Sequence, residues 1–302
     1  ENKMSNKTTR IRVLLDWDQD SKHAIIWAAD KAGLFGKKGL DVEMVPPLPK
    51  SLERVHNGEV ELAINYPHNI LMMRKDFPNL ISVGALVKTN PEGLVTLKKD
   101  GIAKPEDMKN KTIAIGWSPL GKSQIEIFLS HHNLTDQDIE IVPVARDGET
   151  RLLAGEFDVL NGVQYGIPRM EREGHASNFF PYINSGVPDS AFLVFTGQKN
   201  WVDSSTYALK QFFFCLKEGL SLVKKWGKEE WESYTDTIEI RKRDRDEEMA
   251  VWEAILPMID DGGDLFHHDV EEIKKLQEIL FSGGMLDTKY PIEEIFVNSH
   301  LS

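Results

Sequence analysis

The chain has 302 residues, of which 41% are hydrophobic and 28% are charged, the proportions of an ordinary globular protein. This length allows two lobes, each large enough to bury its own core. The formal net charge of −12, with no basic stripe to offset it, excludes non-specific nucleic-acid binding.

A strand over 11–15, a helix over about 22–32 and a strand over 39–45 form the first predicted unit. Alternating apolar residues indicate the first strand, and Asp20 offers an oxygen that can cap the helix. In a parallel crossover unit of this kind, ligands bind beyond the carboxyl ends of the strands. Trp17 directly follows the first strand, so we expect it either to bind a ligand or to pack against the helix.

The same alternation continues along the chain. A short helix over 50–56 is followed by strands over 60–64 and 80–87, and Pro67 can occupy the first position of the helix between them. We interpret 91–93 as a break before a crossover strand into a second lobe. Further strands are predicted over 94–97, 112–115, 157–160 and 192–195. Further helices are predicted over 104–108, 149–153, 204–226, 229–234, 244–257 and 269–281, and one more follows the loop 116–123 and reaches about residue 131.

A polar or glycine residue followed by an aromatic residue recurs at the predicted strand ends. Such aromatic residues suit stacking on a flat ring, while a few polar atoms fix its orientation. This recurrence favours a binding protein over an enzyme. The pairs are Asp16-Trp17, Asn65-Tyr66, Gly116-Trp117 and Gln164-Tyr165.

Catalytic and metal chemistry find little support in the sequence. The single cysteine, Cys215, lies in an apolar run and is predicted to be a buried core thiol. His131-His132 and His267-His268 lack ligand partners at metal spacing, and we expect both pairs to be solvated. The charged run 241–248 is interpreted as a solvated helix start. We therefore predict no catalytic residues, no metal and no cofactor.

The loop Gly116–Ser123 matches the bare Gly-x-x-x-x-Gly-Lys-Ser pattern of a phosphate loop. Pro119 lacks an N–H group where such a loop wraps phosphate, and no convincing partner carboxylate follows a strand. A nucleotide hydrolase is therefore disfavoured. The backbone N–H groups at this helix start still suit an anionic or acceptor-rich ligand atom.

Several segments of the chain together carry the pattern of a known family. They are Leu15-Asp16-Trp17, His23, 31–35, 39–42, 62–67, 101–102, 111–112, 153–158, 186–189 and, weakly, 256–257. These segments resemble solute-binding proteins for thiamine pyrimidine precursors, a group related to the fungal pyrimidine synthases. The resemblance covers most of the chain, and the opening motif and the Gly-Val-Pro-Asp segment are its more specific parts.

This resemblance implies an α/β fold of the type 2 periplasmic-binding-protein class, with a ligand cleft between two lobes. Lobe 1 would comprise 10–93 and 197–302, lobe 2 would comprise 94–196, and 1–9 would be an N-terminal tether or tag remnant. Such proteins are extracytoplasmic monomers that deliver ligand to the permease subunits of an ABC importer. Contact with a membrane would be made only through an N-terminal lipid anchor.

The implied ligand is a thiamine-precursor pyrimidine or a related small aromatic heterocycle, stacked by Trp17 and Tyr66. In the family pattern, an acidic residue commonly lies shortly after the segment Gly186–Asp189, where it could accept a hydrogen bond from an aminopyrimidine. This chain has Phe192 in that region, and a phenylalanine cannot accept a hydrogen bond. A different or more apolar aromatic ligand therefore stays open. The predicted ligand-binding residues are Asp16, Trp17, His23, Asn65, Tyr66, His68, Trp117, Ser118, Gln164, Tyr165, Asp189 and Phe192.

Two alternatives remain. An alkanesulfonate in the same fold is favoured by the Gly116–Ser123 loop and disfavoured by the number of aromatic residues. A pyrimidine-synthase-like enzyme is disfavoured because those enzymes carry a cysteine-rich motif that one cysteine cannot supply. If His23 or His68 contacts the ligand, affinity should change between about pH 5 and 8, where an unperturbed imidazole titrates.

Overall fold

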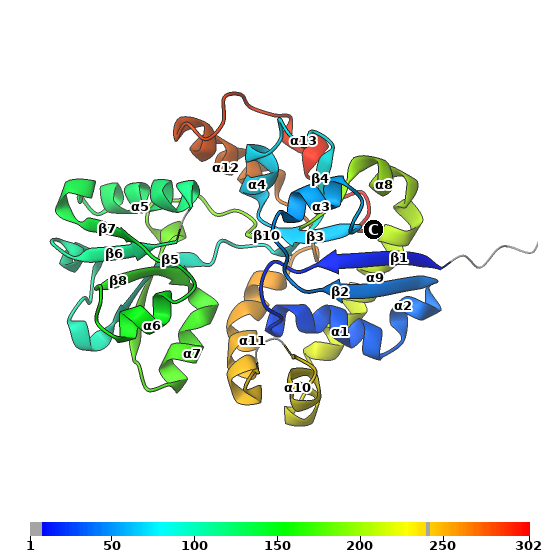
Figure 1. Cartoon of the computed structure of the whole chain (residues 1–302), viewed down its shortest axis with the longest axis horizontal. Coiled ribbons are helices and arrows are strands. Elements are labelled where there is room, and N and C mark those ends of the chain that lie inside the picture. Colours follow the sequence, from blue (N-terminus) through cyan, green and yellow to red (C-terminus); the bar gives the residue numbers. More distant parts are fainter. Residues whose placement is uncertain (1–7, 117, 240–241) are drawn as a thin grey trace, which may run out of the picture. The chain divides into compact units, whose positions relative to one another are not determined.

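The computed structural model describes residues 8–116, 118–239 and 242–302, which fold into two compact units (Figure 1). The first unit comprises the chain up to Lys88 together with Ala191–Lys274 and Tyr290–Ser302. The second comprises Thr89–Ser190 and Lys275–Lys289. Within the described ranges, no helix combines the length and apolar character needed to cross a membrane.

The first unit is built on a five-stranded sheet with the strand order β2-β1-β3-β10-β4. β1 runs parallel to β2 and β3, whereas β10 runs antiparallel to β3 and β4. The carboxyl ends of β1 and β3 therefore meet the amino end of β10 at one edge of the sheet. The strands are β1 (Thr9–Leu14), β2 (Leu40–Val45), β3 (Leu62–Asn65), β4 (Leu80–Val87) and β10 (Leu193–Gln198).

Helices cover both faces of this sheet, and Figure 1 shows α1 and α3 on opposite sides of it. The predicted first helix begins as a 3₁₀ turn, Ser21–His23, before α1. The predicted helix 204–226 corresponds to α9, and the short helix α8 before it, which ends at Ser204, was not predicted. The helices are α1 (Ala24–Lys31), α2 (Leu34–Lys37), α3 (Ser51–His56), α4 (Pro67–Met72), α8 (Lys199–Ser204), α9 (Thr206–Val223), α10 (Lys228–Thr235), α11 (Arg245–Ile259), α12 (Val270–Ser282), which continues into the second unit, and α13 (Ile292–Ile295).

The second unit repeats the plan, with the strand order β7-β6-β8-β5-β9. β5 is antiparallel to β8 and β9, whereas β6 is parallel to β7 and β8. α5 packs on one face, and α6 and α7 on the other (Figure 1). The elements are β5 (Glu92–Leu97), β6 (Thr112–Ile115), α5 (Pro119–His131), β7 (Glu140–Pro143), α6 (Gly148–Leu153), β8 (Val159–Val163), α7 (Ile167–Arg172) and β9 (Ser177–Pro181).

The interpretation of 91–93 as a break is wrong, because β5 begins at Glu92 and includes Gly93. Gly93 pairs with Gly162 on one side and Pro181 on the other. A Cβ atom on Gly93 would lie 2.4 Å from the carbonyl oxygen of Phe180, so this strand needs a glycine where the backbones approach closely.

One of the two histidine pairs expected to be solvated contributes a buried ring, so that expectation is wrong for His268. Its Nε2 atom lies 2.6 Å from the hydroxyl oxygen of Ser82, and its Nδ1 atom lies 2.9 Å from Asn298 Oδ1. Burial lowers the pKa of His268 to about 4. This side chain therefore connects β4 to the C-terminal segment as a neutral group.

The core of the first unit is aromatic where α9 meets the sheet. Phe195 of β10 packs edge-to-face against Phe212 and Phe213 of α9. Cys215 is fully buried beside this group, which confirms the predicted core thiol. On the same helix, a Cβ atom at Gly219 would lie 2.4 Å from the carbonyl oxygen of Ile25, so α9 and α1 pack with their backbones close together.

We expect Gly219→Ala to lower the free energy of unfolding by about 1–3 kcal/mol, because the added methyl group forces two packed helices apart. Urea denaturation followed by circular dichroism measures this change. Gly36→Ala is the matched control, since a Cβ atom there meets nothing within 4 Å. Equal stabilities of the two variants would contradict the close packing of α1 and α9.

Candidate functional site

Aromatic side chains gather at the edge of the first sheet where β1 and β3 end. Tyr66 follows β3 and precedes Pro67, the first residue of α4, as the sequence predicts. Its ring lies edge-on to Phe192, with centroids 5.1 Å apart, and stacks on His68 at 5.4 Å. The structure thus brings three predicted site residues together from β3, α4 and the start of β10.

Trp17 lies beyond the end of β1, the strand that pairs with β3 in parallel. It is 38% exposed, so it is not a core residue beneath the first helix. A partly exposed indole at the carboxyl end of a parallel strand has the position and surface that stacking on a ligand requires.

Asn65 is held by its own neighbours. Its Oδ1 atom accepts hydrogen bonds from the backbone N–H of Tyr66 at 2.7 Å and from Asn69 Nδ2 at 3.1 Å, while its Nδ2 atom donates to Ser51 Oγ. These bonds leave one amide hydrogen of Asn65 for any further partner. The contacts hold the backbone that carries Tyr66.

Burial lowers the pKa of the half-buried His68 to about 4. The unperturbed titration between about pH 5 and 8 that we expected for His68 is therefore wrong for the protein alone, because burial of the ring disfavours the imidazolium ion.

Asp16 also contacts protein groups. Its carboxylate lies 2.9 Å from His23 Nε2 and 3.5 Å from Lys22 Nζ, and its side chain is only 4% exposed. Burial favours the neutral acid, but the attraction of Lys22 and the hydrogen bond from His23 override it, so the pKa of Asp16 is lowered.

His23 closes the capping box at the start of the first helix. The backbone N–H of Asp20 donates to Nδ1 at 3.1 Å, so Nδ1 is the accepting nitrogen and Nε2 carries the hydrogen that faces Asp16. Because the ring is fully buried and both nitrogens are used, His23 orients the loop between β1 and the helix.

A lysine is buried between the two aspartates of this loop. Lys22 Nζ lies 2.6 Å from Asp20 Oδ2, and its side chain is 2% exposed. Burial alone would raise the pKa of Asp20, but the opposing attraction of Lys22 and the hydrogen bond from its ammonium group lower that pKa. The loop that carries Trp17 therefore begins and ends at carboxylates held by one ammonium group.

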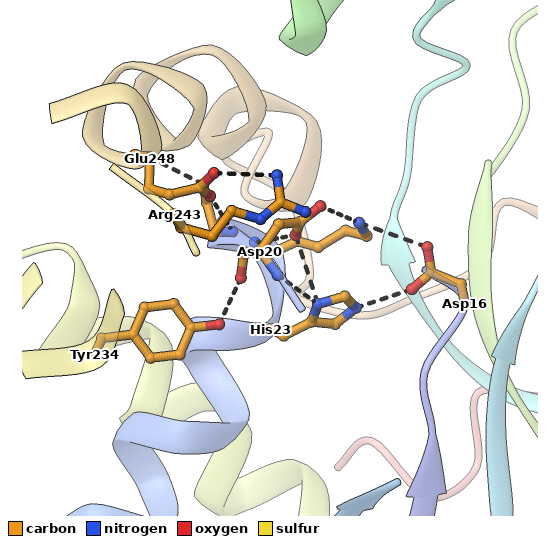
Figure 2. Close-up of polar contacts among 8 residues, drawn as sticks. Asp16, Asp20, His23, Tyr234, Arg243 and Glu248 are labelled. Carbon is orange, nitrogen blue, oxygen red and sulfur yellow. Dashed lines mark hydrogen bonds and ion pairs between the residues drawn. The ribbon is translucent and has the colours of Figure 1, made fainter. Parts of the chain in front are cut away.

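Helix α11 and the segment before it complete this group of charges, with Glu248 on the helix and Arg243 two residues before its first residue (Figure 2). Glu248 Oε2 accepts hydrogen bonds from the backbone N–H of Ser21 at 2.8 Å and from its hydroxyl at 2.6 Å. Glu248 Oε1 lies 3.6 Å from Arg243 Nη1, and Tyr234 donates its hydroxyl hydrogen to the carbonyl oxygen of Asp20 at 2.5 Å. We call Asp16, Asp20, Ser21, Lys22, His23, Tyr234, Arg243 and Glu248 the buried polar cluster.

The interpretation of 241–248 as a solvated helix start is therefore wrong at two positions. Arg243 is 7% exposed and Glu248 is fully buried, because the start of the first helix supplies donors for the carboxylate. Residue 241 lies outside the described residues.

The second unit presents its own set of predicted residues at the corresponding sheet edge. Ser118 caps α5 by accepting a hydrogen bond from the N–H of Gly121 at 3.1 Å, and Lys122 is exposed beside Glu126, 3.9 Å away. In a phosphate loop, the backbone N–H groups and the lysine contact the phosphate groups of the ligand. Here the N–H of Gly121 and the side chain of Lys122 contact protein groups instead. Trp117, predicted as a ligand residue, lies outside the described residues.

Three further predicted residues lie in the second unit. Gln164 and Tyr165 form a 3₁₀ turn directly after β8, and the Oε1 atom of Gln164 is buried without a hydrogen-bond donor. Asp189 accepts the backbone N–H of Asn90 at 2.8 Å, and burial raises its pKa.

The sequence analysis missed Glu92, which lies at the start of β5 with its Oε2 atom 2.8 Å from Gln124 Nε2. Burial raises the pKa of this carboxyl group. Its signal in the sequence is an acidic residue just before the apolar run 94–97, and we interpreted this residue as part of the break over 91–93.

We expect Glu248→Ala to lower the free energy of unfolding by about 3–5 kcal/mol, because it leaves Arg243 and the donors of Ser21 without their buried partner. Glu253→Ala, on the exposed side of the same helix, is the control and should change stability little. Chemical denaturation of both variants gives the difference. A Glu248 variant as stable as the control would show that the cluster contributes nothing to stability.

Three relatives illustrate what the chain resembles in sequence. It is 25% identical to a thiamine biosynthesis protein of Haemophilus influenzae over 298 residues, covering 95% of this chain and 91% of that protein. It is 23% identical to the formylaminopyrimidine-binding protein of Halalkalibacterium halodurans, over 69% of this chain and 64% of the relative. A 4-amino-5-hydroxymethyl-2-methylpyrimidine phosphate synthase of Saccharomyces cerevisiae is 26% identical over 52% of this chain and 47% of the relative.

Among solved structures, the periplasmic aliphatic sulphonate-binding protein of Escherichia coli matches with a TM-score of 0.77 at 11% identity, over 95% of this chain and 97% of that chain. The expected two-lobed type 2 periplasmic-binding-protein fold is thereby confirmed. The model of the NMT1/THI5-like family matches residues 20–226, which is more than half of the chain. This chain belongs to the NMT1/THI5-like family.

Proposed function

We propose that this chain is an extracytoplasmic solute-binding protein that captures a thiamine-precursor pyrimidine, or a related small aromatic heterocycle, for an ABC importer. The observation that carries the proposal is the aromatic group of Tyr66, His68 and Phe192 at a sheet edge, with Trp17 partly exposed after the neighbouring strand. Family membership and the formylaminopyrimidine-binding relative support the same ligand class.

On the basis of the contacts described above, we assign the predicted site residues three roles. Trp17 and Tyr66 are proposed to stack on the ring, with Phe192 and neutral His68 supporting Tyr66 from its side. Asp16, His23 and Asn65 act on the ligand through the loops they hold. Ser118, Gln164, Tyr165 and Asp189 are proposed to supply polar contacts from the second unit.

A role in binding without catalysis agrees with the chemistry of Cys215. Burial raises the pKa of this thiol, and a nucleophile requires the opposite shift. Binding-protein relatives and neighbours favour the same role, although synthases also occur among the relatives.

Isothermal titration calorimetry with three probes tests the proposal. The probes are 4-amino-5-hydroxymethyl-2-methylpyrimidine, a formylaminopyrimidine and an alkanesulfonate. We expect one of the two pyrimidines to bind, and the alkanesulfonate to bind at least tenfold more weakly. Binding of the alkanesulfonate alone would favour the alternative ligand, and turnover of a pyrimidine into a new product, seen by mass spectrometry, would contradict a binding-only role.

We expect Trp17→Ala to weaken pyrimidine binding by roughly 1–3 kcal/mol, which is about ten- to a hundredfold in affinity, because one stacking surface is lost. The melting temperature should change little, since the indole is already partly exposed. Tyr207→Ala, at a position 70% exposed on α9, is the control and should alter neither quantity. Lost stability with unchanged affinity would remove Trp17 from the site.

A further inference from the structure

Glu92 lies at a position in the second unit from which its side chain could contact a bound ligand. It is the first residue of β5, which runs antiparallel to β8. The start of β5 therefore lies at the same edge as the carboxyl ends of β6 and β8, the edge at which open α/β sheets bind ligands. Glu92 pairs with Val163, and Gln164 follows directly after this pair.

The carboxyl group of Glu92 is held by neutral amides. Gln124 Nε2 donates to Glu92 Oε2 at 2.8 Å, and the side-chain amide of Asn161 donates as well. The orientation of Gln124 is fixed, because its Oε1 atom accepts a hydrogen bond from Asn90 Nδ2 at 2.7 Å. Asn90 Oδ1 in turn accepts the backbone N–H of Glu92 at 3.0 Å. This ring of hydrogen bonds fixes the position of the Glu92 carboxyl group but supplies no positive charge to pair with it.

No lysine or arginine in the described ranges forms an ion pair with Glu92. The titratable group that faces it is Tyr182, whose hydroxyl donates to Asn161 Oδ1. Burial raises the pKa of Glu92, and the two amide donors only partly offset that effect. The carboxylate has acceptor sites beyond the two that these amides use. A partner with N–H donors would stabilise it.

A second acceptor at this edge lacks a donor. Gln164 Oε1 is buried without a hydrogen-bond partner, although the backbone N–H of the same residue donates to the carbonyl oxygen of Pro91 at 2.8 Å. Buried acceptors without a donor are rare in folded proteins because they lose their hydrogen bonds to water. One carboxyl group with acceptor sites to spare, on Glu92, and one acceptor without a donor, on Gln164, therefore come from neighbouring positions of this pair of strands.

We infer that Glu92 determines ligand specificity by accepting N–H groups from an amidine-type edge, in which a ring nitrogen lies beside an amino group, while Gln164 accepts a further N–H. This inference rests on the proposed function, and it names the edge of the ligand ring that residues of the second unit would recognise. A structural role alone does not require the acid, because the neutral amide of a glutamine at position 92 could accept the same hydrogen bond from Gln124.

The test measures selectivity. Wild-type protein and Glu92→Gln are titrated with 4-amino-5-hydroxymethyl-2-methylpyrimidine and with an analogue that carries a methyl group in place of the amino group. We expect wild type to prefer the amino compound at least tenfold. Glu92→Gln should lose ten- to a hundredfold in affinity for the amino compound and little for the analogue, so that the preference disappears. Glu140→Gln, at an exposed position on β7, is the control for the loss of one negative charge.

Circular dichroism and thermal unfolding show whether Glu92→Gln is folded. If it is not, Gln164→Met removes the second acceptor at similar size, and we expect it to reduce the preference as well. An unchanged preference in the folded variant would overturn the inference and leave the proposed function intact. Failure of wild type to bind these compounds and also the formylaminopyrimidine would instead overturn the proposed function, and this inference with it. If wild type binds the formylaminopyrimidine alone, that compound and its methyl analogue take the place of the first pair in the same comparison.

Discussion

The ammonium group of Lys22, buried between the carboxylates of Asp16 and Asp20, is the constraint on which the first unit depends. A buried charge is tolerated only where partners replace its water. Three carboxylates and two cations of the buried polar cluster meet this requirement jointly, with Glu248 and Arg243 supplied by the chain more than two hundred residues later. The loop that carries Trp17 therefore takes its position from α11 as well as from β1 (Figure 2).

Much of the fold could be predicted because it follows from local patterns. The strands Leu80–Val87 and Thr112–Ile115 are found at the predicted residues, since continuous apolar runs report burial on both faces. The strands Glu140–Pro143 and Ser177–Pro181 were missed because they lie at the edges of their sheet, where a strand needs no such run. Gly93 was interpreted as part of a break because glycine is common both at breaks between elements and where backbones approach closely.

The candidate site was predictable in part. Aromatic residues after strands are visible in the sequence, and Tyr66 and Phe192 do meet. The hydrogen bonds that occupy Asp16 and Asn65 were not visible, because a carboxylate or amide at a strand end looks the same whether its partner is a ligand or a neighbouring loop. Glu92 was missed because nothing near it in the sequence shows that it is buried and hydrogen-bonded. Its partner Gln124 comes from a helix 32 residues away.

The order of strands in the first sheet has a consequence for biosynthesis. β10 lies between β3 and β4, yet the ribosome makes it only after nearly the whole second unit. Until it arrives, β4 has no strand partner and β3 has an open edge, and pairing across so long a separation is slow. Open strand edges template association with other chains. The nascent protein is therefore most exposed to aggregation while its second unit is being synthesised, and a chaperone that shields β3 and β4 during that interval would raise its yield.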